Sequence, residues 1–169
     1  MISIEKASKE ALGDLAAMAK TIWLDYYIDI ISIDQIQYML NQFYSLEALL
    51  EQIKNNQQFN FIVYNQQRIG FIAYSIQNDK TCFINKFYLL SEYQGKSYGS
   101  KCLDELEKQI QKENSNTISA FKLTVNRQNF KSINFYFKNG FTIEKVADFD
   151  IGNGFVMNDF IMKKLIIAC

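Results

Sequence analysis

Three segments rich in Phe, Ile, Val and Tyr follow one another between residues 59 and 90, and only short polar stretches separate them. β-Branched and aromatic residues favour strands, so residues 59–64, 69–77 and 82–90 are predicted to be strands. Residues 65–68 form a predicted hairpin between the first two, and residues 78–80 form a second turn. A chain with this run at its centre is expected to build its fold around a β-sheet.

Apolar residues recur at helical spacing on both sides of these strands. The spacing predicts three helices before them and two after them, the last at residues 129–139. Further strands are predicted at 3–6, 120–125, 141–149 and 155–165. The order β-α-α-α-β-β-β-α-β-α-β-β indicates a mixed sheet with helices on both faces, which is an α/β or α+β architecture. No linker interrupts it, so residues 1–169 are predicted to form a single domain.

Two residue types are missing, and their absence excludes whole classes of chemistry. The chain has 0 His and 0 Pro. Without His there is no imidazole for acid–base catalysis, no Ser-His-Asp or Cys-His pair and no His-containing metal site. The 18 basic and 18 acidic residues balance each other, which argues against a nucleic-acid binder built on bulk charge. We therefore predict no metal site and no nucleic-acid partner.

Cysteine usage and the N-terminus favour a cytoplasmic protein without a membrane partner. Cys82, Cys102 and Cys169 form no C-x-x-C pair, and their odd number argues against a disulfide scaffold. We interpret them as reduced thiols. The first residues lack the apolar stretch of a signal peptide, and no segment approaches the roughly 18–20 apolar residues of a membrane span.

The segment from Gln94 to Ser100 is the strongest candidate for a binding site. A strand ends there, a glycine-containing turn follows and a helix begins, so free backbone N–H groups and a helix dipole point to one place. Such a turn suits a phosphate group, although a turn that needs glycine only for its dihedral angles has the same sequence. The tripeptide Gly95-Lys96-Ser97 is not a nucleotide-binding P-loop, because that motif requires a glycine where Leu90 stands.

Two signatures in this sequence resemble those of the GNAT family of N-acetyltransferases. Gln94, Ser97 and Gly99 follow the family's pyrophosphate-loop pattern Arg/Gln-x-x-Gly-x-Gly/Ala, with Ser97 in place of its first glycine. Residues 129–141 follow the second pattern, Asn-x-x-Ala-x-x-Phe-Tyr-x-x-x-Gly-Phe, with Ser132 in place of Ala. The resemblance covers residues 86–141 and implies a mostly antiparallel sheet. The final hairpin looks more loosely like a bacterial branch that includes polyamine acetyltransferases.

The resemblance implies an enzyme that transfers an acetyl group from acetyl-CoA to a primary amine by direct attack in a ternary complex. The acceptor would be a small molecule such as a polyamine. The pyrophosphate of CoA would bind backbone N–H groups of the loop, and the pantetheine arm would pair with an open strand edge. The implied cofactor-binding residues are Phe87, Tyr88, Leu89, Gln94, Gly95, Lys96, Ser97, Tyr98, Gly99, Ser100, Asn126, Asn129 and Tyr136.

Tyr136 is the implied catalytic residue, a general acid that protonates the leaving thiolate. The alternative is a core tyrosine whose hydroxyl is satisfied by the protein. Asn129 stands where the family holds CoA or its bound water, and the same residue is a natural helix N-cap. The general base stays open, because Asn85 occupies the position where many relatives place Glu. A chain of water molecules to bulk solvent is one alternative. The carboxylates that remain as candidates are Asp25, Asp29, Asp148, Asp150 and Asp159.

The acceptor is expected beside residues 23–31 and the last hairpin. Trp23, Asp25, Tyr26 and Tyr27 interleave aromatic and acidic side chains, which suits a cationic amine. Core aromatics beside surface acids are the alternative. Two other functions stay open: a non-catalytic acyl-CoA-binding regulator on the same fold, and a peptide or protein N-acetyltransferase. The resemblance also allows a homodimer through the last strands.

Overall fold

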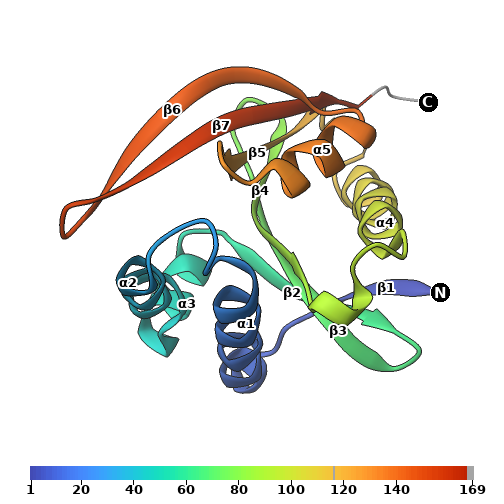
Figure 1. Cartoon of the computed structure of the whole chain (residues 1–169). Coiled ribbons are helices and arrows are strands. Elements are labelled where there is room, and N and C mark those ends of the chain that lie inside the picture. The colour runs from blue at the N-terminus through green and yellow to red at the C-terminus, as the bar shows by residue number, and fades with distance from the viewer. Residues whose placement is uncertain (116, 167–169) are drawn as a thin grey trace.

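A computed structural model describes residues 1–115 and 117–166 (Figure 1). The strands form one 7-stranded sheet in the order β1-β2-β3-β4-β5-β7-β6. β4 and β5 pair parallel, and the other neighbours pair antiparallel. The predicted mixed, mostly antiparallel sheet is therefore confirmed. The strands are β1 (Ile2–Lys6), β2 (Gln58–Tyr64), β3 (Gln67–Ile76), β4 (Thr81–Leu89), β5 (Ala120–Asn126), β6 (Thr142–Gly152) and β7 (Phe155–Leu165).

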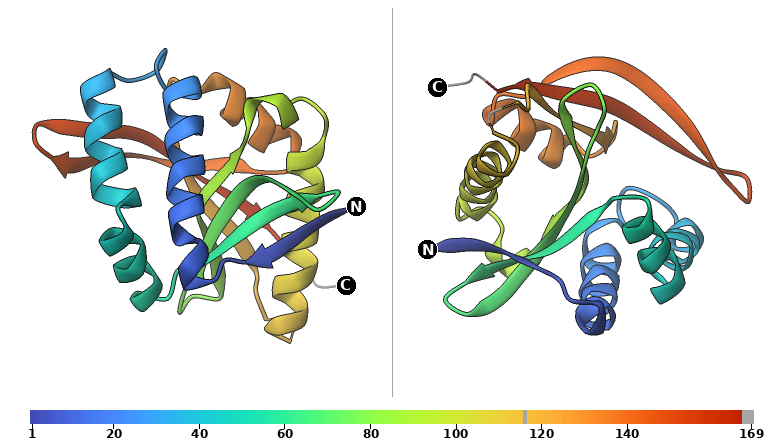
Figure 2. Two further views of the ribbon diagram at one scale, coloured as in Figure 1. Left: turned by 90° about the horizontal axis from the view of Figure 1, so that it is seen from below. Right: turned by 180° about the vertical axis from the view of Figure 1, so that it is seen from behind.

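Helices cover both faces of the sheet, as predicted (Figure 2). One face carries α1 (Leu12–Tyr26), α2 (Ile33–Tyr44) and α3 (Leu46–Lys54), and the other carries α4 (Tyr98–Glu113) and α5 (Phe130–Lys138). Each face has its own hydrophobic core. Short 3-10 turns, η1 (Lys9–Ala11) and η2 (Ser91–Tyr93), lead into α1 and out of β4.

Three helices begin with a side-chain N-cap. The Ser32 hydroxyl accepts a hydrogen bond from the Gln35 N–H at 3.2 Å, and the Ser45 hydroxyl accepts one from Ala48 at 3.3 Å. Asn129 caps α5 in the same way. Ser8 is different, because its side chain makes no cap hydrogen bond and a 3-10 turn precedes the helix. Helix α1 then continues to Tyr26, so it includes the first residues of the predicted acceptor segment 23–31.

The long hairpin of β6 and β7 reaches across the molecule to α2 (Figure 1). Its two turn residues, Asn153 and Gly154, both have positive φ (54° and 76°), as the twist of a tight hairpin requires. Near the tip, the Tyr38 hydroxyl of α2 donates a hydrogen bond to the Ile151 carbonyl at 2.7 Å. The Tyr38 ring also lies 5.4 Å from that of Phe155. The hairpin is thus tied to the three-helix face at its far end.

The sheet opens between β4 and β5. Their pairing runs from Thr81 opposite Ala120 to Ile84 opposite Leu123 and ends there. Asn85 is an extra residue in the pairing of β4 with β3, a β-bulge. Beyond the bulge, β4 follows β3 while β5 follows β7, and the two halves of the sheet diverge (Figure 1).

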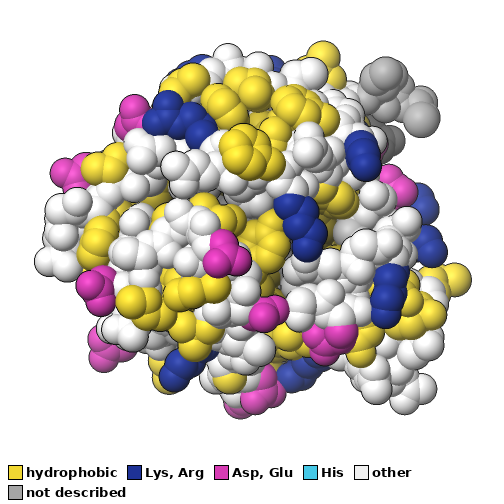
Figure 3. Space-filling view, viewed as in Figure 1, with side chains coloured by type: hydrophobic (Ala, Val, Ile, Leu, Met, Phe, Trp, Pro, Cys, Tyr) yellow, Lys and Arg dark blue, Asp and Glu magenta, His cyan; other side chains and the backbone are white. Residues whose placement is uncertain are grey.

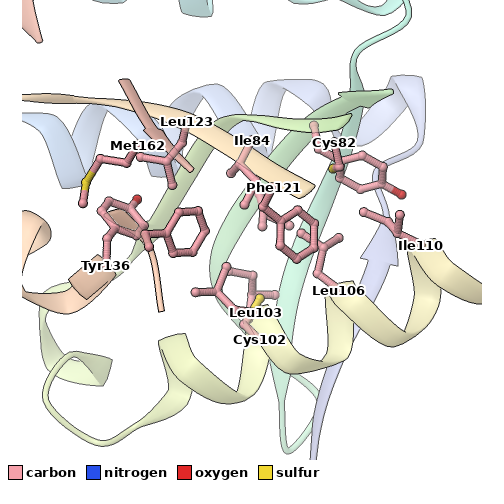
Figure 4. Packing of buried hydrophobic residues seen from close by; sticks show 14 of the residues in the cluster. Cys82, Ile84, Cys102, Leu103, Leu106, Ile110, Phe121, Leu123, Tyr136 and Met162 are labelled. Atoms are coloured by element: carbon pink, nitrogen blue, oxygen red, sulfur yellow. The ribbon is translucent and has the colours of Figure 1, made fainter. Parts of the chain in front are cut away.

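The core beneath α4 and α5 holds two of the cysteines (Figure 4). Cys82 and Cys102 are both buried and free. Burial raises the pKa of the Cys102 thiol to about 12 and that of Cys82 further, so both are unreactive thiols. Cys169 lies outside the described residues. In the part of the chain with known placement, no helix has the length and apolar character to cross a membrane.

Candidate active site

A cavity of about 810 Å³ occupies the opening between β4 and β5. Its walls come from α1 and α2 on one side and from α5 and the start of α4 on the other. Figure 3, viewed from the same side as Figure 1, shows hydrophobic side chains in a hollow near the centre of the molecule. The divergence of two central strands therefore creates a concave site beside the predicted loop, which is a usual setting of a ligand site in a mixed sheet.

The structure brings most of the predicted site residues together in this cavity. Two do not join them: the side chains of Asp25 and Lys96 are exposed and lie outside the cavity lining. The predicted residues that do line it are Trp23, Tyr26, Tyr27, Phe87, Tyr88, Leu89, Gln94, Gly95, Ser97, Tyr98, Gly99, Ser100, Asn126, Asn129 and Tyr136.

The loop before α4 is shaped to hold an anion. Gly95 has a φ of +72° and no atom within 4 Å of where a Cβ would be, so its backbone is open to a ligand. Ser97, the N-cap of α4, has a φ of +60° and makes no side-chain cap hydrogen bond. The first N–H groups of this 16-residue helix therefore have no partner within the helix. Together with the helix dipole they create a region of positive potential at the loop. These features fit a pyrophosphate group.

Gly99 has a packing role in addition to its place in the loop pattern. A Cβ on Gly99 would lie 3.0 Å from the Phe135 ring of α5. A glycine is needed because α4 and α5 approach closely at this point, and Gly99 also lines the cavity. Gly95 is the glycine whose open backbone matches the sequence prediction.

The edge of β4 that faces the cavity carries unpaired backbone groups. The Leu90 N–H donates to the Ile69 carbonyl on β3 at 2.9 Å. Because backbone groups alternate along an antiparallel pair, the N–H groups of Phe87 and Leu89 point the other way, toward β5. Pairing with β5 has already ended at Ile84. These N–H groups are free to bind the amide-containing arm of a ligand, as in strand addition.

Tyr136 lies on α5 next to Met162, at the cavity end of the core (Figure 4). It is 8% exposed, and its hydroxyl takes part in none of the hydrogen bonds between described residues. Burial, with a smaller contribution from Tyr26, raises the pKa of Tyr136 well above its usual value. The phenol therefore keeps its proton at neutral pH and is available as a donor.

Asn129 combines a structural role with a place in the site. Its side chain is buried and its Oδ1 accepts the Ser132 N–H at 3.1 Å, which confirms the N-cap. The same oxygen accepts a hydrogen bond from the Tyr26 hydroxyl at 2.8 Å. Asn129 thus links α5 to α1 across the cavity.

Aromatic rings from α1 form the other wall. Trp23 stacks on Tyr27 with ring centroids 4.5 Å apart, and Tyr88 of β4 packs against both. Trp23 is only 4% exposed, so it belongs to the core as well as to the cavity wall. The alternative of surface acids beside core aromatics is therefore correct for Asp25 and partly correct for Trp23.

The five candidate carboxylates are in very different environments. Asp25 and Asp29 are exposed on or after α1. Asp148 pairs with Arg127, and Asp150 accepts the Gly152 N–H at 2.8 Å. Asp159 lines the cavity and is 1% exposed.

The position that many relatives give to Glu cannot supply a base here. Asn85 occupies it, and the Asn85 Oδ1 accepts a hydrogen bond from the Ser75 hydroxyl at 3.1 Å. A neutral amide held in this way accepts no proton from an ammonium group at neutral pH.

Sequence reasoning missed several charged residues of the cavity. Lys86 follows the bulge on β4 and contacts the Gln52 side chain, with its ammonium 5.3 Å from the Phe59 ring. Burial lowers the pKa of Lys86 to about 8. Lys131 and Lys138 of α5 also line the cavity. Lysines on strands and short helices are common, so no local pattern distinguishes these three; only the placement of β4 and α5 does.

Comparison with known proteins places these features in context. Residues 16–141 match the model of the acetyltransferase (GNAT) family. The chain is similar to a spermidine N(1)-acetyltransferase of Thermoplasma acidophilum, at 35% identity over 161 residues, which is 92% of this chain and 95% of the relative.

Solved structures of acetyltransferases have a similar fold. A PaiA N-acetyltransferase of Thermoplasma acidophilum in complex with coenzyme A matches with a TM-score of 0.78 and 33% identity, over 98% of this chain and 99% of that one. A GNAT-related protein of Rhodopseudomonas palustris shares the fold with a TM-score of 0.77 at 16% identity, over 97% and 95% of the two chains.

Proposed function

The chain belongs to the acetyltransferase (GNAT) family, and from this premise we propose that it acetylates a primary amine of a small molecule such as a polyamine, with Tyr136 as the general acid. It is an acetyl-CoA-dependent N-acetyltransferase. We further propose that residues 1–169 act as one domain and that the amine attacks directly in a ternary complex.

One observation carries this proposal. A single cavity touches the anion-binding loop before α4, the free edge of β4, Tyr136 and the aromatic wall of α1. Both substrates therefore have a place in the same cavity, which supports direct transfer between them. Bringing two reactants together in this way can supply several kcal/mol of the barrier reduction.

The residues present fit coenzyme A in three places. The backbone around Gly95 and the start of α4 suit the pyrophosphate, and Lys131 and Lys138 add positive charge. The Leu89 N–H, at the end of β4, suits a pantetheine amide. When bound, acetyl-CoA supplies an activated thioester whose carbonyl carbon the amine attacks and whose sulfur leaves as a thiolate. The Phe87 N–H, which is farther from the loop than the Leu89 N–H, is the proposed donor to the thioester oxygen, where negative charge develops.

Tyr136 is proposed to donate its hydroxyl proton to the departing sulfur. Its hydroxyl is not used by other described groups, and the raised pKa keeps it protonated. Because such a phenol is a weak acid, the proton moves only as the C–S bond breaks and negative charge builds on sulfur.

Charge on the three-helix face supports a cationic acceptor. Between residues 12 and 54 the acidic residues outnumber the lysines. In Figure 3 acidic side chains gather over the half of the face where α1–α3 lie. Such a field attracts a polycation and raises its association rate at low salt. The similar protein named spermidine N(1)-acetyltransferase supports the same acceptor class. The acidic residues are Asp14, Asp25, Asp29, Asp34, Glu47 and Glu51, against Lys20 and Lys54.

The test is thiol release from acetyl-CoA over a panel of spermidine, spermine, putrescine, single amino acids and short peptides with free N-termini. We expect the highest kcat/KM with a polyamine and a fall in kcat/KM as salt is added. Preference for peptides would instead identify a peptide or protein N-acetyltransferase. Calorimetric binding of acetyl-CoA without turnover of any amine would identify a non-catalytic regulator.

A matched pair of variants tests the acidic face directly. Glu51 lines the cavity, whereas Glu47 lies on the same helix outside the lining. Glu51→Gln is expected to raise the KM for a polyamine about threefold, the size of a weak exposed charge interaction. Glu47→Gln is expected to leave it unchanged. An equal effect of both changes would show that general charge, rather than the cavity wall, attracts the acceptor.

A further inference from the structure

Asp159 is a buried carboxyl group within the sheet. It lies on β7 opposite Asn126 of β5 and Ala147 of β6, and only 1% of the residue is exposed. Its Oδ1 atom has no hydrogen-bond partner in the described part of the chain. Burying a carboxylate oxygen without a partner is costly. The position therefore fits a group that meets its partner when a substrate is bound.

The Asp159 side chain lies on the acceptor side of the sheet. Side chains alternate along a strand, so Asp159 shares its face with Met157 and not with Phe160. Met157 packs against the core of α1–α3, and Phe160 packs against the core of α4 and α5. Asp159 also lines the cavity that contains Tyr136. It thus faces the place where an amine bound beside α1 would lie.

The other candidate carboxylates lack this combination. Asp25, Asp29, Asp148 and Asp150 are all exposed, and none lines the cavity. Two of them already have partners, Arg127 for Asp148 and the Gly152 N–H for Asp150. Asp159 is the one member of the five that is buried, unpaired at Oδ1 and part of the cavity lining.

We propose that the Asp159 carboxylate is the catalytic base that removes a proton from the ammonium group of the acceptor. The inference rests on the proposed function, because it assumes an amine in this cavity. Polyamine and amino-acid nitrogens are largely protonated at neutral pH, and a protonated nitrogen has no lone pair for attack. A carboxylate within reach also attracts the ammonium group before it is deprotonated.

The proton and electron balance of the transfer is complete with these two residues. R–NH3⁺ gives one proton to Asp159 Oδ1 and becomes R–NH2. The nitrogen lone pair then forms the N–C bond while the C–S bond breaks, and its electrons pass to sulfur. Tyr136 gives its hydroxyl proton to that sulfur and regains the second N–H proton of the amine. Asp159 finally releases its proton to water, so the products are an amide, a thiol and one proton.

The groups around Asp159 set the pKa of its carboxyl group. Burial raises the pKa of Asp159 to about 6, although the Thr124 hydroxyl and the Arg127 guanidinium oppose the rise and Asp148 adds to it slightly. These groups face it from β5, the loop after β5, and β6. A carboxyl with this pKa is ionised at pH 7, and it is a stronger base than an exposed aspartate.

Asp159→Asn is the direct test, with Asp150→Asn on the same hairpin as the control. We expect kcat/KM for the preferred polyamine at pH 7 to fall at least 100-fold in Asp159→Asn. We also expect the acidic limb of its pH profile near 6 to disappear. Acetyl-CoA affinity, measured by calorimetry, should change less than threefold. Asp150→Asn should keep both the rate and the limb. An Asp159→Asn variant with the wild-type rate and limb overturns the proposal.

A weakly basic amine separates proton transfer from a structural role. Such an acceptor is already neutral at pH 7 and does not need a base before attack. We expect Asp159→Asn to lose less than 10-fold in kcat/KM with it. Equal losses with weakly and strongly basic acceptors would mean that Asp159 only maintains the site, which overturns the proposal.

The wild-type enzyme keeps the proposal falsifiable if Asp159→Asn does not fold, as judged by circular dichroism. Its kcat/KM profile should show an acidic limb near pH 6 with a strongly basic acceptor and lose that limb with a weakly basic one. A profile without a limb near 6 for either acceptor overturns the proposal. Failure of the proposed function is a different result, since the wild-type enzyme would then acetylate no small amine.

Discussion

Gln94 Nε2 donates a hydrogen bond to the Leu89 carbonyl at 2.9 Å, and this bond ties the loop before α4 to the end of β4. The Oε1 atom of the same side chain accepts a hydrogen bond from Lys131 of α5 at 2.6 Å. One amide group therefore joins the loop, the strand and the helix that border the cavity. Gln94, the glutamine of the first signature, therefore holds the loop in place through hydrogen bonds within the protein.

Removing this amide should loosen the loop. Gln94→Ala loses both hydrogen bonds, and we expect the Kd for CoA to rise about tenfold, which corresponds to about 1.4 kcal/mol. Calorimetry with CoA measures the change. Gln109→Ala is the control, because Gln109 makes one exposed hydrogen bond to Glu113 far along α4. Equal affinities of Gln94→Ala and the wild-type protein would show that the loop is held in place without this side chain.

Tyr136→Phe tests the proposed general acid. We expect kcat to fall about 100-fold because the departing thiolate no longer receives a proton from the protein. The Kd for acetyl-CoA should stay within about twofold. Tyr74→Phe is a suitable control, since Tyr74 is fully buried and bonded to Gln58 but lies outside the cavity. That variant is expected to lose about 1 kcal/mol of stability and no activity. An unchanged kcat in Tyr136→Phe would remove the assignment.

Gly99→Ala tests the close approach of α4 and α5. The new methyl group would lie 3.0 Å from the Phe135 ring, so we expect unfolding in urea to show a loss of about 1–3 kcal/mol. Adding Phe135→Leu should recover part of that loss, which a double-mutant cycle would detect as a coupling of at least about 0.5 kcal/mol. Additive effects would mean that the ring moves away at no cost.

Lys86 is expected to lower the stability of the protein at neutral pH. Burial lowers its pKa to about 8 in the folded protein, whereas an unfolded lysine titrates near 10.4. Between these two values the unfolded chain binds more protons, so the free energy of unfolding should rise with pH from about 8 to 10. Below pH 8 the cost of the buried charge is present in full.

The variant Lys86→Met measures that cost. We expect it to be more stable than the wild-type protein by about 1–2 kcal/mol at pH 7, and by less at pH 10. Denaturation in urea at both pH values gives the comparison. Lys54→Met is the control, because Lys54 is exposed and pairs with Glu51 at the surface. A Lys86→Met protein that is less stable at pH 7 would show that the contacts with Gln52 and the aromatic rings outweigh the burial of the charge.

The element order and several ends of elements could be predicted from the sequence because they depend on neighbouring residues. Ser32, Ser45 and Asn129 cap helices with their own side chains. Gly140 ends α5 with a φ of +85°, which few other residues adopt easily. The two signatures also depend on neighbouring residues, and the loop and the helix that carry them both border the cavity.

The interior of the site could not be predicted in this way, because it depends on contacts between distant segments. Nothing local in β4 and β5 shows that their pairing ends at Ile84. Asn158 and Asp159 are two adjacent polar residues between apolar ones in β7, and the sequence does not show which of them is buried. Asp25 follows Trp23 by two residues, and the rotation of α1 alone leaves its side chain on the outside.

Because the pairing between β4 and β5 ends early, backbone groups in the middle of the sheet are accessible to solvent. In the protein without its donor, the amide hydrogens of Phe87 and Leu89 have water as their partner, so they should exchange with deuterium as fast as those of an edge strand. We propose that the pantetheine arm of the donor replaces that water, so that the donor itself completes the sheet as a short last strand.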